Sequence, residues 1–197
     1  MSDVNVNPQP GDLGFTTIGG VVGDVVNYGQ AGLHDACRFD HVFVVVCPVG
    51  SPGTPDGLIV EAMPSGARFR PLAERLGPGF AYASIDLTDE QRRMVYAVAL
   101  SFTSARGGRG VPYSFGTYLE LALAQYRVTR WATPGLRKAI DNHGHLICSQ
   151  LADELLRRVG YQAFDDGRWK GDVTPGDLYY RFDPRVIQPA PASVDGA

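Results

Sequence analysis

One cysteine in this chain lies where nucleophilic chemistry would require it. Cys148 precedes an apolar pattern of helical spacing, with leucines at 151, 155 and 156 and Gly160 after the last turn. We therefore expect a helix that carries the apolar positions through Val159, with Cys148 at or just before its N-terminus. The positive end of the helix dipole favours a thiolate, which is the reactive form of the residue. The alternative is an inert buried thiol, the commoner role of a lone cysteine.

His41 and Glu61 are expected on neighbouring strands of one hairpin. His41 lies in the β-branched run 39–47, and Glu61 lies in a second short apolar run, 58–62. A loop centred near Pro52 would place the two side chains almost opposite each other. A thiolate needs a base, and the base needs a partner that orients its second nitrogen. The cysteine, histidine and glutamate supply these three types, although a core histidine and a solvated glutamate are the ordinary alternatives.

The remaining patterns predict one α+β domain in which a mainly antiparallel sheet packs against helices. We expect a flexible arm over 1–10, the domain over 11–183 and a disordered tail rich in Pro and Ala over 184–197. Further strands are expected within 11–15, 67–72, 80–85 and, after a turn, 173–180, and further helices over 19–28, from Thr88 through Phe102 and over 118–126.

Composition indicates a globular protein without an electrostatic footprint for nucleic acid. The chain has 197 residues, a net charge of -3 and no basic run. No apolar stretch reaches the roughly 20 residues that cross a bilayer, and the sequence opens without a signal-peptide pattern. Three cysteines without an export signal are expected to be reduced. These features predict a protein that is cytoplasmic at synthesis, with no transmembrane segment, no nucleic-acid partner and no cofactor.

Five short sequence motifs occur in an order that resembles that of a known family. They are Gly11-Asp-Leu-Gly-Phe15, Asp40-His-Val-Phe-Val-Val45, Ile59-Val-Glu-Ala62, Cys148-Ser-Gln-Leu151 and Thr174-Pro-Gly-Asp-Leu178. The set resembles circularly permuted NlpC-type, papain-like hydrolases, most of all the YiiX/YebB-like group with relatives of lecithin:retinol acyltransferase. In that arrangement the histidine strand precedes the cysteine helix, as it does here. The resemblance spans roughly residues 10–180. In its general sequence pattern the chain also resembles hydrolase-like proteins of actinobacteria and their phages.

The resemblance implies a permuted papain-like fold with the nucleophile at a helix N-terminus. It implies Cys148 as nucleophile, His41 as general base and Glu61 as the polar residue that orients the imidazole. The backbone N–H of the cysteine is the expected oxyanion donor. Gln150 stands where the group often has glutamate, which leaves the triad intact and alters the pocket.

Four further residues are candidates for binding the oxyanion or lining the substrate cleft. The resemblance matches Tyr113 to a tyrosine of a Pro-Tyr phrase that helps to bind the oxyanion, with an insertion of about thirty residues before the cysteine here. Asp40 and Ser149 adjoin the proposed base and nucleophile. His145 precedes the nucleophile closely, although loop histidines are usually just exposed.

The implied reaction is acyl transfer through a thioester, which makes the expected partner a peptide or acyl substrate. Peptidase or amidase activity is the favoured form, and cell-wall peptide is one substrate class. A phage-encoded copy would be found in the virion or released to the cell wall. Lipid acyl groups are the other substrate class of the superfamily.

Two other interpretations stay open at this point. The spacings His34-x-x-Cys37-x-x-x-His41 and His143-x-His145-x-x-Cys148 would suit zinc, although neither has paired Cys-x-x-Cys arms and a shared site would use up the triad. The second alternative is a non-catalytic module, such as a structural or tail-associated phage component, that keeps the fold for binding.

Overall fold

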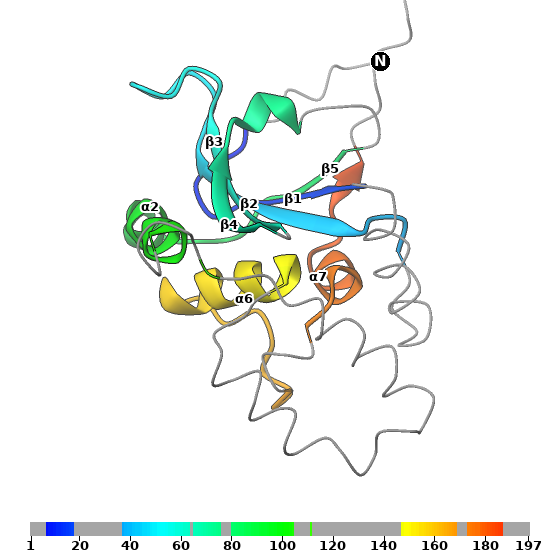
Figure 1. Cartoon of the computed structure of the whole chain (residues 1–197). Helices are drawn as coiled ribbons and strands as arrows, with labels where there is room; N and C mark the ends of the chain where they lie inside the picture. The colour runs from blue at the N-terminus through cyan, green and yellow to red at the C-terminus, as the bar shows by residue number, and fades with distance from the viewer. Residues whose placement is uncertain are drawn as a thin grey trace, which may run out of the picture.

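The fold is an antiparallel sheet with helices packed on one face. The structure, a computed structural model, describes residues 7–17, 37–63, 65–75, 80–104, 111, 147–168 and 173–186. Within these residues six strands pair antiparallel in the order β4-β3-β2-β1-β5-β6 (Figure 1). The strands are β1 (Leu13–Thr16), β2 (His41–Cys47), β3 (Leu58–Met63), β4 (Gly66–Arg70), β5 (Ala81–Ala83) and β6 (Arg185–Val186). The predicted α+β class with an antiparallel sheet is confirmed.

Two helices form where the sequence predicts them, α2 (Asp89–Thr103) and α6 (Cys148–Arg158). Thr88 and Gln91 make a capping box at the start of α2. Thr88 Oγ1 accepts from Gln91 N at 3.2 Å, and Gln91 Oε1 accepts from Thr88 N at 2.9 Å. After α6, Gly160 has a φ of 85°, a conformation that glycine adopts without strain and that ends the helix.

The strand predicted within 173–180 is wrong, because Pro175–Phe182 forms a third helix, α7. Thr174 Oγ1 accepts from Asp177 N at 3.0 Å, and Asp177 Oδ2 accepts from Thr174 N at 2.9 Å. This capping box, with proline in the first turn, favours a helix start over a strand. Asp183, in the left-handed conformation with a φ of 45°, ends the helix.

Ordered structure extends into both predicted end segments. Arg185–Val186, expected in the disordered tail, pairs with β5 as strand β6. At the other end, Pro8 of the expected flexible arm is buried, and Gln9 makes backbone hydrogen bonds with the turn before β1. The predicted helices over 19–28 and 118–126 lie outside the described residues.

The sheet has an apolar core on each face. Helices α6 and α7 lie beneath the sheet in Figure 1. The larger core fills the space between the sheet and these helices. A smaller core on the other face lies near the 3₁₀ helix η1 (Leu72–Glu74). Strand β2 alternates between the two: Val42, Val44 and Val46 face the helices, and Phe43 and Val45 face away. Of the helices that the structure describes, none combines the length and apolarity needed to span a membrane.

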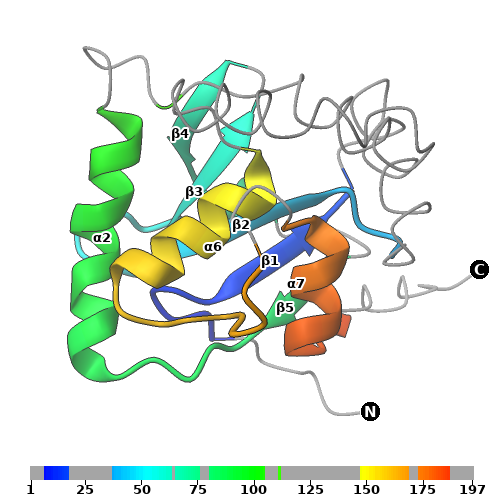
Figure 2. The ribbon, with the colours of Figure 1, turned by 90° about the horizontal axis from the view of Figure 1, so that it is seen from below.

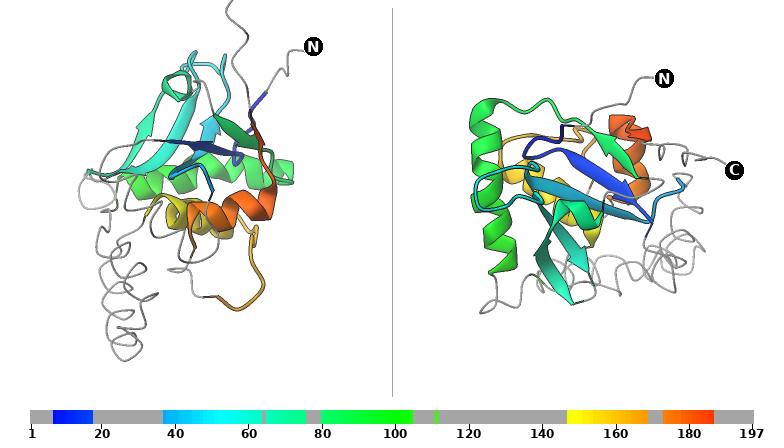
Figure 3. Two further views of the ribbon diagram at one scale, coloured as in Figure 1. Left: turned by 90° about the vertical axis from the view of Figure 1, so that its right-hand side faces the viewer. Right: turned by 90° about the horizontal axis from the view of Figure 1, so that it is seen from above.

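Strands β2 and β3 separate at one end. Their pairing starts at Val44 opposite Val60. Beyond it, β2 continues against β1 as far as His41, and β3 continues against β4 through Glu61 to Met63. The sheet therefore divides into two arms, β1–β2 and β3–β4, which diverge in Figures 2 and 3. Helix α6 contacts both β2 and β3, and Figure 2 shows its N-terminal end over this fork.

A fully buried carboxylate ties the start of β1 to β5 and α2. Asp12 Oδ2 accepts from Gln9 N at 2.7 Å and from the Tyr82 hydroxyl. Its Oδ1 accepts from Ile85 N at 3.0 Å and from Arg92 Nη1 at 3.1 Å. Burial and the bond to Asp12 raise the pKa of Tyr82 above its ordinary value. We call this cluster the Asp12 site, and its partners make it a structural cross-link.

Candidate active site

Cys148 is the first residue of α6, as predicted, and it is 1% exposed. Leu151 N makes the first helical hydrogen bond, to Ile147 O at 2.9 Å. The N–H groups that precede it in the first turn have no acceptor within the helix, so they and the helix dipole favour negative charge there. Ile147 has no polar side chain, and Gln150 Oε1 instead accepts from Ile147 N at 3.2 Å. The surroundings of the sulfur therefore suit a thiolate.

The side chain of His41 hydrogen-bonds that of Cys148. Its Nε2 lies 2.9 Å from Glu61 Oε2, so Nδ1 is the nitrogen left for the sulfur. His41 is 1% exposed and Glu61 is fully buried. When the imidazole is protonated, both nitrogens donate, one to the sulfur and one to the carboxylate. The structure thus brings together the three residues that the sequence analysis singled out.

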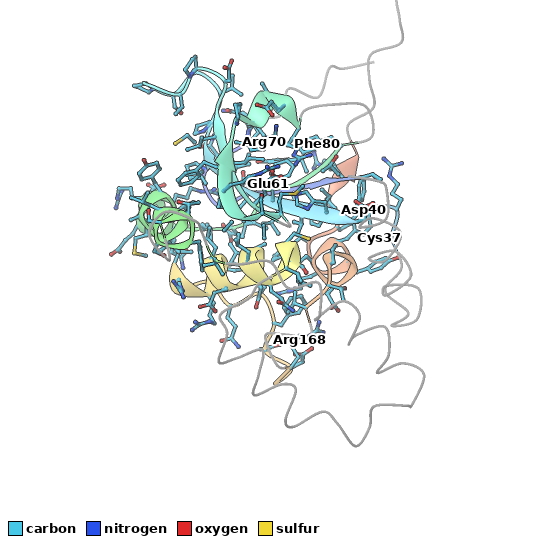
Figure 4. All side chains as sticks on the ribbon, in the orientation of Figure 1. Cys37, Asp40, Glu61, Arg70, Phe80 and Arg168 are labelled. Atoms are coloured by element: carbon cyan, nitrogen blue, oxygen red, sulfur yellow. The ribbon has the colours of Figure 1, made fainter. Side chains whose placement is uncertain are left out.

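The contact between His41 and Glu61 forms across the fork. The sequence analysis places the two residues almost opposite each other on paired strands. The register of β2 and β3, continued past Val44 and Val60, would instead place Phe43 opposite Glu61. The two side chains therefore meet diagonally, at the point where the arms of the sheet separate. Glu61 (labelled in Figure 4) lies on β3 beside the edge strand β4, and a charged residue buried there requires partners.

Two arginines that the sequence analysis missed complete the surroundings of Glu61. Arg68, on β4, donates to Glu61 Oε1 from Nε and Nη2, both at 3.0 Å. Arg75, which follows η1, donates from Nη2 to Oε2 at 2.5 Å. The signal for Arg68 was available: residues on either side of a short turn pair across a hairpin, and Glu61 is directly opposite Arg68. The signal for Arg75 was absent, because it depends on how η1 packs.

The charges of the site stabilise one another. Burial alone would lower the pKa of His41, but the hydrogen bonds and charges of Cys148 and Glu61 outweigh it and raise the pKa to about 9. Burial alone would raise the pKa of Glu61, but its contacts with His41, Arg75 and Arg68 lower the pKa to about 2. At neutral pH the pair is therefore imidazolium and carboxylate. The same attraction favours the thiolate at Cys148.

Of the four other predicted cleft residues, two lie within the described part of the chain, and both are buried. Asp40 is 1% exposed and directly precedes His41. Ser149 is fully buried and donates its hydroxyl to Val173 O at 2.7 Å, which ties α6 to the segment before α7. Tyr113 and His145 lie outside the described residues. The proposed roles of these four residues stay predictions.

A metal site was the alternative interpretation of the same region. Within the part of the chain that the structure describes, no group of three or more His, Cys, Asp and Glu side chains is placed to hold a metal ion. His34, His143 and His145, on which the zinc spacings depend, lie outside that part. The described contacts of His41 are instead with a sulfur and a carboxylate.

Comparisons with known proteins give no match. A scan against models of protein families finds none, and neither does a search among curated proteins. What the chain does must therefore be inferred from the contacts among Cys148, His41 and Glu61 themselves.

Proposed function

We propose that the chain is a cysteine-dependent hydrolase or acyltransferase that acts on an amide or ester bond, with peptidase or amidase activity as the favoured form. The observation that carries this proposal is the buried series of contacts from Cys148 through His41 to Glu61. A cysteine at a helix N-terminus beside an ionised imidazole is stabilised as a thiolate. A cysteine that only fills the core does not require an ion pair beside it. Burying such a pair has a desolvation cost, which a purely structural site would avoid.

The chemistry follows from the positions of the three side chains. The Cys148 thiolate attacks the carbonyl carbon, a carbon–sulfur bond forms, and the oxygen takes the negative charge. First-turn N–H groups of α6 stabilise that oxygen. The tetrahedral intermediate collapses to a thioester as the leaving amine or alkoxide takes the proton from the His41 imidazolium. Water or an amine then attacks the thioester, gives its proton to His41 and releases the thiolate.

We also propose that the fold is a permuted papain-like one. Two described features support this proposal: the histidine strand β2 precedes the cysteine helix α6 in the chain, and α6 packs against β2 and β3 of an antiparallel sheet. A peptide or acyl substrate, with cell-wall peptide as one class, follows from the same family resemblance.

The first test measures how fast each cysteine reacts. The folded protein is treated with iodoacetamide between about pH 5 and pH 9, and alkylation is read by mass at each cysteine. Cys37 and Cys47 are partly exposed internal references. We expect Cys148 to react fastest well below pH 8 despite its burial, and to slow at least about tenfold in the His41→Ala variant. Thiolate absorbance in the far ultraviolet, with Cys148→Ala as blank, measures ionisation without requiring reagent access.

A second test measures the covalent step. With p-nitrophenyl acetate, attack by Cys148 releases one equivalent of nitrophenolate and leaves an acetyl group on the cysteine, detected as added mass. Added amine that accelerates turnover indicates acyl transfer, and turnover in water alone indicates hydrolysis. The proposal fails if Cys148 reacts no faster than Cys37 or only on unfolding, and shows no thiolate absorbance near neutral pH. A binding role would then be the better account.

A further inference from the structure

The segment from β4 through the residue that caps η1, residues 66–75, saturates one carboxylate of the site with donors. Glu61 Oε1 accepts two hydrogen bonds from the fork of Arg68, and Oε2 accepts one from His41 and one from Arg75. A carboxylate has about four lone-pair positions, so this one is filled. Glu61 can therefore neither rotate nor take up a proton without losing a charged partner.

The two arginines differ from the other charged groups of this segment. Arg70 and Glu74 form an ion pair with each other, both partly exposed at its surface. Arg75 is only 15% exposed, and Arg68 is 38% exposed. Arg68 and Arg75 both contact the fully buried Glu61. Because Arg70 and Glu74 neutralise each other, these two arginines give the segment a net positive charge beside the pair of His41 and Glu61.

An unassisted histidine and glutamate, buried together, would not hold this charge distribution. In a medium of low dielectric constant, a buried imidazolium–carboxylate pair tends to move its proton to the carboxylate, because the neutral pair avoids the cost of desolvation. Two guanidinium groups on the carboxylate oppose that transfer, since they stabilise only its ionised form.

We propose that Arg68 and Arg75 are positioning residues that keep Glu61 ionised and fixed, so that the proton of the buried pair stays on His41. This inference rests on the proposed function of Cys148 and His41. The arginines touch neither the thiol nor the imidazole in the described contacts, and they act through Glu61.

The consequence is a defined pH window for reactivity. Charged groups reach Glu61 from three elements, His41 on β2, Arg68 on β4 and Arg75 after η1, and His41 is faced by Glu61 and Cys148. A thiolate and an imidazolium coexist between the pH at which the thiol ionises and the pH at which the imidazolium loses its proton. Without one of the arginines, Glu61 takes the proton more readily, so the thiol ionises at a higher pH, the imidazolium is lost at a lower pH, and the window narrows.

The test compares pH profiles of Arg75→Gln and Arg68→Gln with those of the unaltered protein. The lower limit is read from the rate of Cys148 alkylation, and the upper limit from the NMR titration of the His41 ring, assigned with His41→Ala. We expect the alkylation midpoint to rise and the His41 midpoint to fall, each by about one pH unit. Arg75→Lys, which keeps the charge, should restore them. Arg92→Gln is the matched control, because it removes a similarly buried arginine, 19% exposed, from the Asp12 site.

The outcomes separate the two levels of inference. The positioning role is overturned if the arginine variants lose rate at every pH while both midpoints stay in place, or if Arg92→Gln moves them equally. Arg68→Gln, at the more exposed position, decides the question if Arg75→Gln does not fold. If the unaltered protein itself has no reactive window at Cys148, the proposed function fails instead.

Discussion

Asp12 and Glu61 are fully buried carboxylates that each bind arginine, yet their surroundings differ in kind. Two of the four donors to Asp12 are backbone N–H groups, and a third is a tyrosine hydroxyl. Every donor to Glu61 is a side chain that carries charge when protonated. The first carboxylate therefore fixes the backbone, and the second sets the charge of its neighbours.

The comparison indicates what distinguishes the candidate active site around Glu61 from the structural cross-link at Asp12. Burial and a paired arginine are common to both carboxylates. Of the two, only Glu61 contacts an imidazole, and that imidazole contacts a thiol. We therefore expect changes at Glu61 to act on the reactivity of Cys148 as well as on stability, and changes at Asp12 to act on stability alone.

The largest expected effect is that of Glu61→Gln on the reactivity of Cys148. The neutral amide no longer stabilises the imidazolium or fixes its ring, so we expect alkylation near neutral pH to slow by about 100-fold, the lower end of what loss of an acid–base group costs. Mass-resolved alkylation checks this. Asp12→Asn should stay within about twofold of the unaltered rate while folded, and a loss in both variants would remove the distinction between the two sites.

The next effect is that of Asp12→Asn on stability. The amide turns a donor toward groups that are themselves donors and leaves Arg92 without its charge partner, so we expect the free energy of unfolding to fall by about 3 kcal/mol. Urea unfolding followed by circular dichroism measures this loss. A value below about 1 kcal/mol would mean that the Asp12 site is not the cross-link described.

Acid should weaken the fold through Glu61. Its pKa is about 2 in the folded protein and 4.5 ordinarily, so its contribution is present above pH 4.5 and is lost as the pH falls through 2. Between pH 7 and pH 3 we expect the unaltered protein to lose about 2 kcal/mol more stability than Glu61→Gln does, by proton linkage. Urea unfolding of both proteins at the two pH values measures the difference. Parallel losses would contradict the pairing.

The smallest effect is expected at a third acid, Glu154, on the same helix as Cys148. Its partners, Arg157 and Arg158, are 59% and 44% exposed, so solvent screens these ion pairs. We expect Arg157→Gln to lower the free energy of unfolding by about 0.5 kcal/mol, measured by urea unfolding, and to leave Cys148 alkylation unchanged. A slower Cys148 in this variant would show that any charge on α6, and not the fork, controls the thiol.

Local sequence patterns predict some helices and strands correctly and others wrongly, and one repeated four-residue motif shows why. Pro-Gly-Asp-Leu occurs at 10–13 and at 175–178. In each copy the aspartate accepts a hydrogen bond from the backbone N–H three residues earlier, that of Gln9 at 2.7 Å and that of Thr174 at 2.9 Å. The first copy leads into strand β1 and the second begins helix α7. The four residues alone do not decide the structure.

The residue before the phrase decides it. The Thr174 hydroxyl accepts from Asp177 N, which completes a helix cap. Gln9 offers its backbone carbonyl to Asp12 N at 3.0 Å, and Gly11 takes a φ of 93°, so the chain turns and extends. A capping box of threonine and aspartate was therefore a readable signal for α7 that the sequence analysis passed over.

The candidate site was predictable as far as local spacing reaches. The helix start at Cys148 and the hairpin that carries His41 and Glu61 follow from periodicity and turn composition. The contact between His41 and Glu61 follows as well, because a loop centred near Pro52 brings the two side chains within reach of each other. The contact between Cys148 and His41 depends on the docking of α6 against the sheet, which no local pattern contains.

The fork has a consequence for the order in which the site assembles. His41 and Glu61 are twenty residues apart, on strands joined by one short loop, so closing their contact requires little chain entropy. Cys148 follows His41 by about a hundred residues, and its helix must dock over the fork before the thiol meets the imidazole. The histidine–carboxylate pair therefore belongs to a local folding unit, and Cys148 joins it through a long-range contact. If the reactivity of Cys148 depends on His41, the fraction of molecules with a reactive thiol would equal the fraction in which α6 has docked and the contact between Cys148 and His41 has formed.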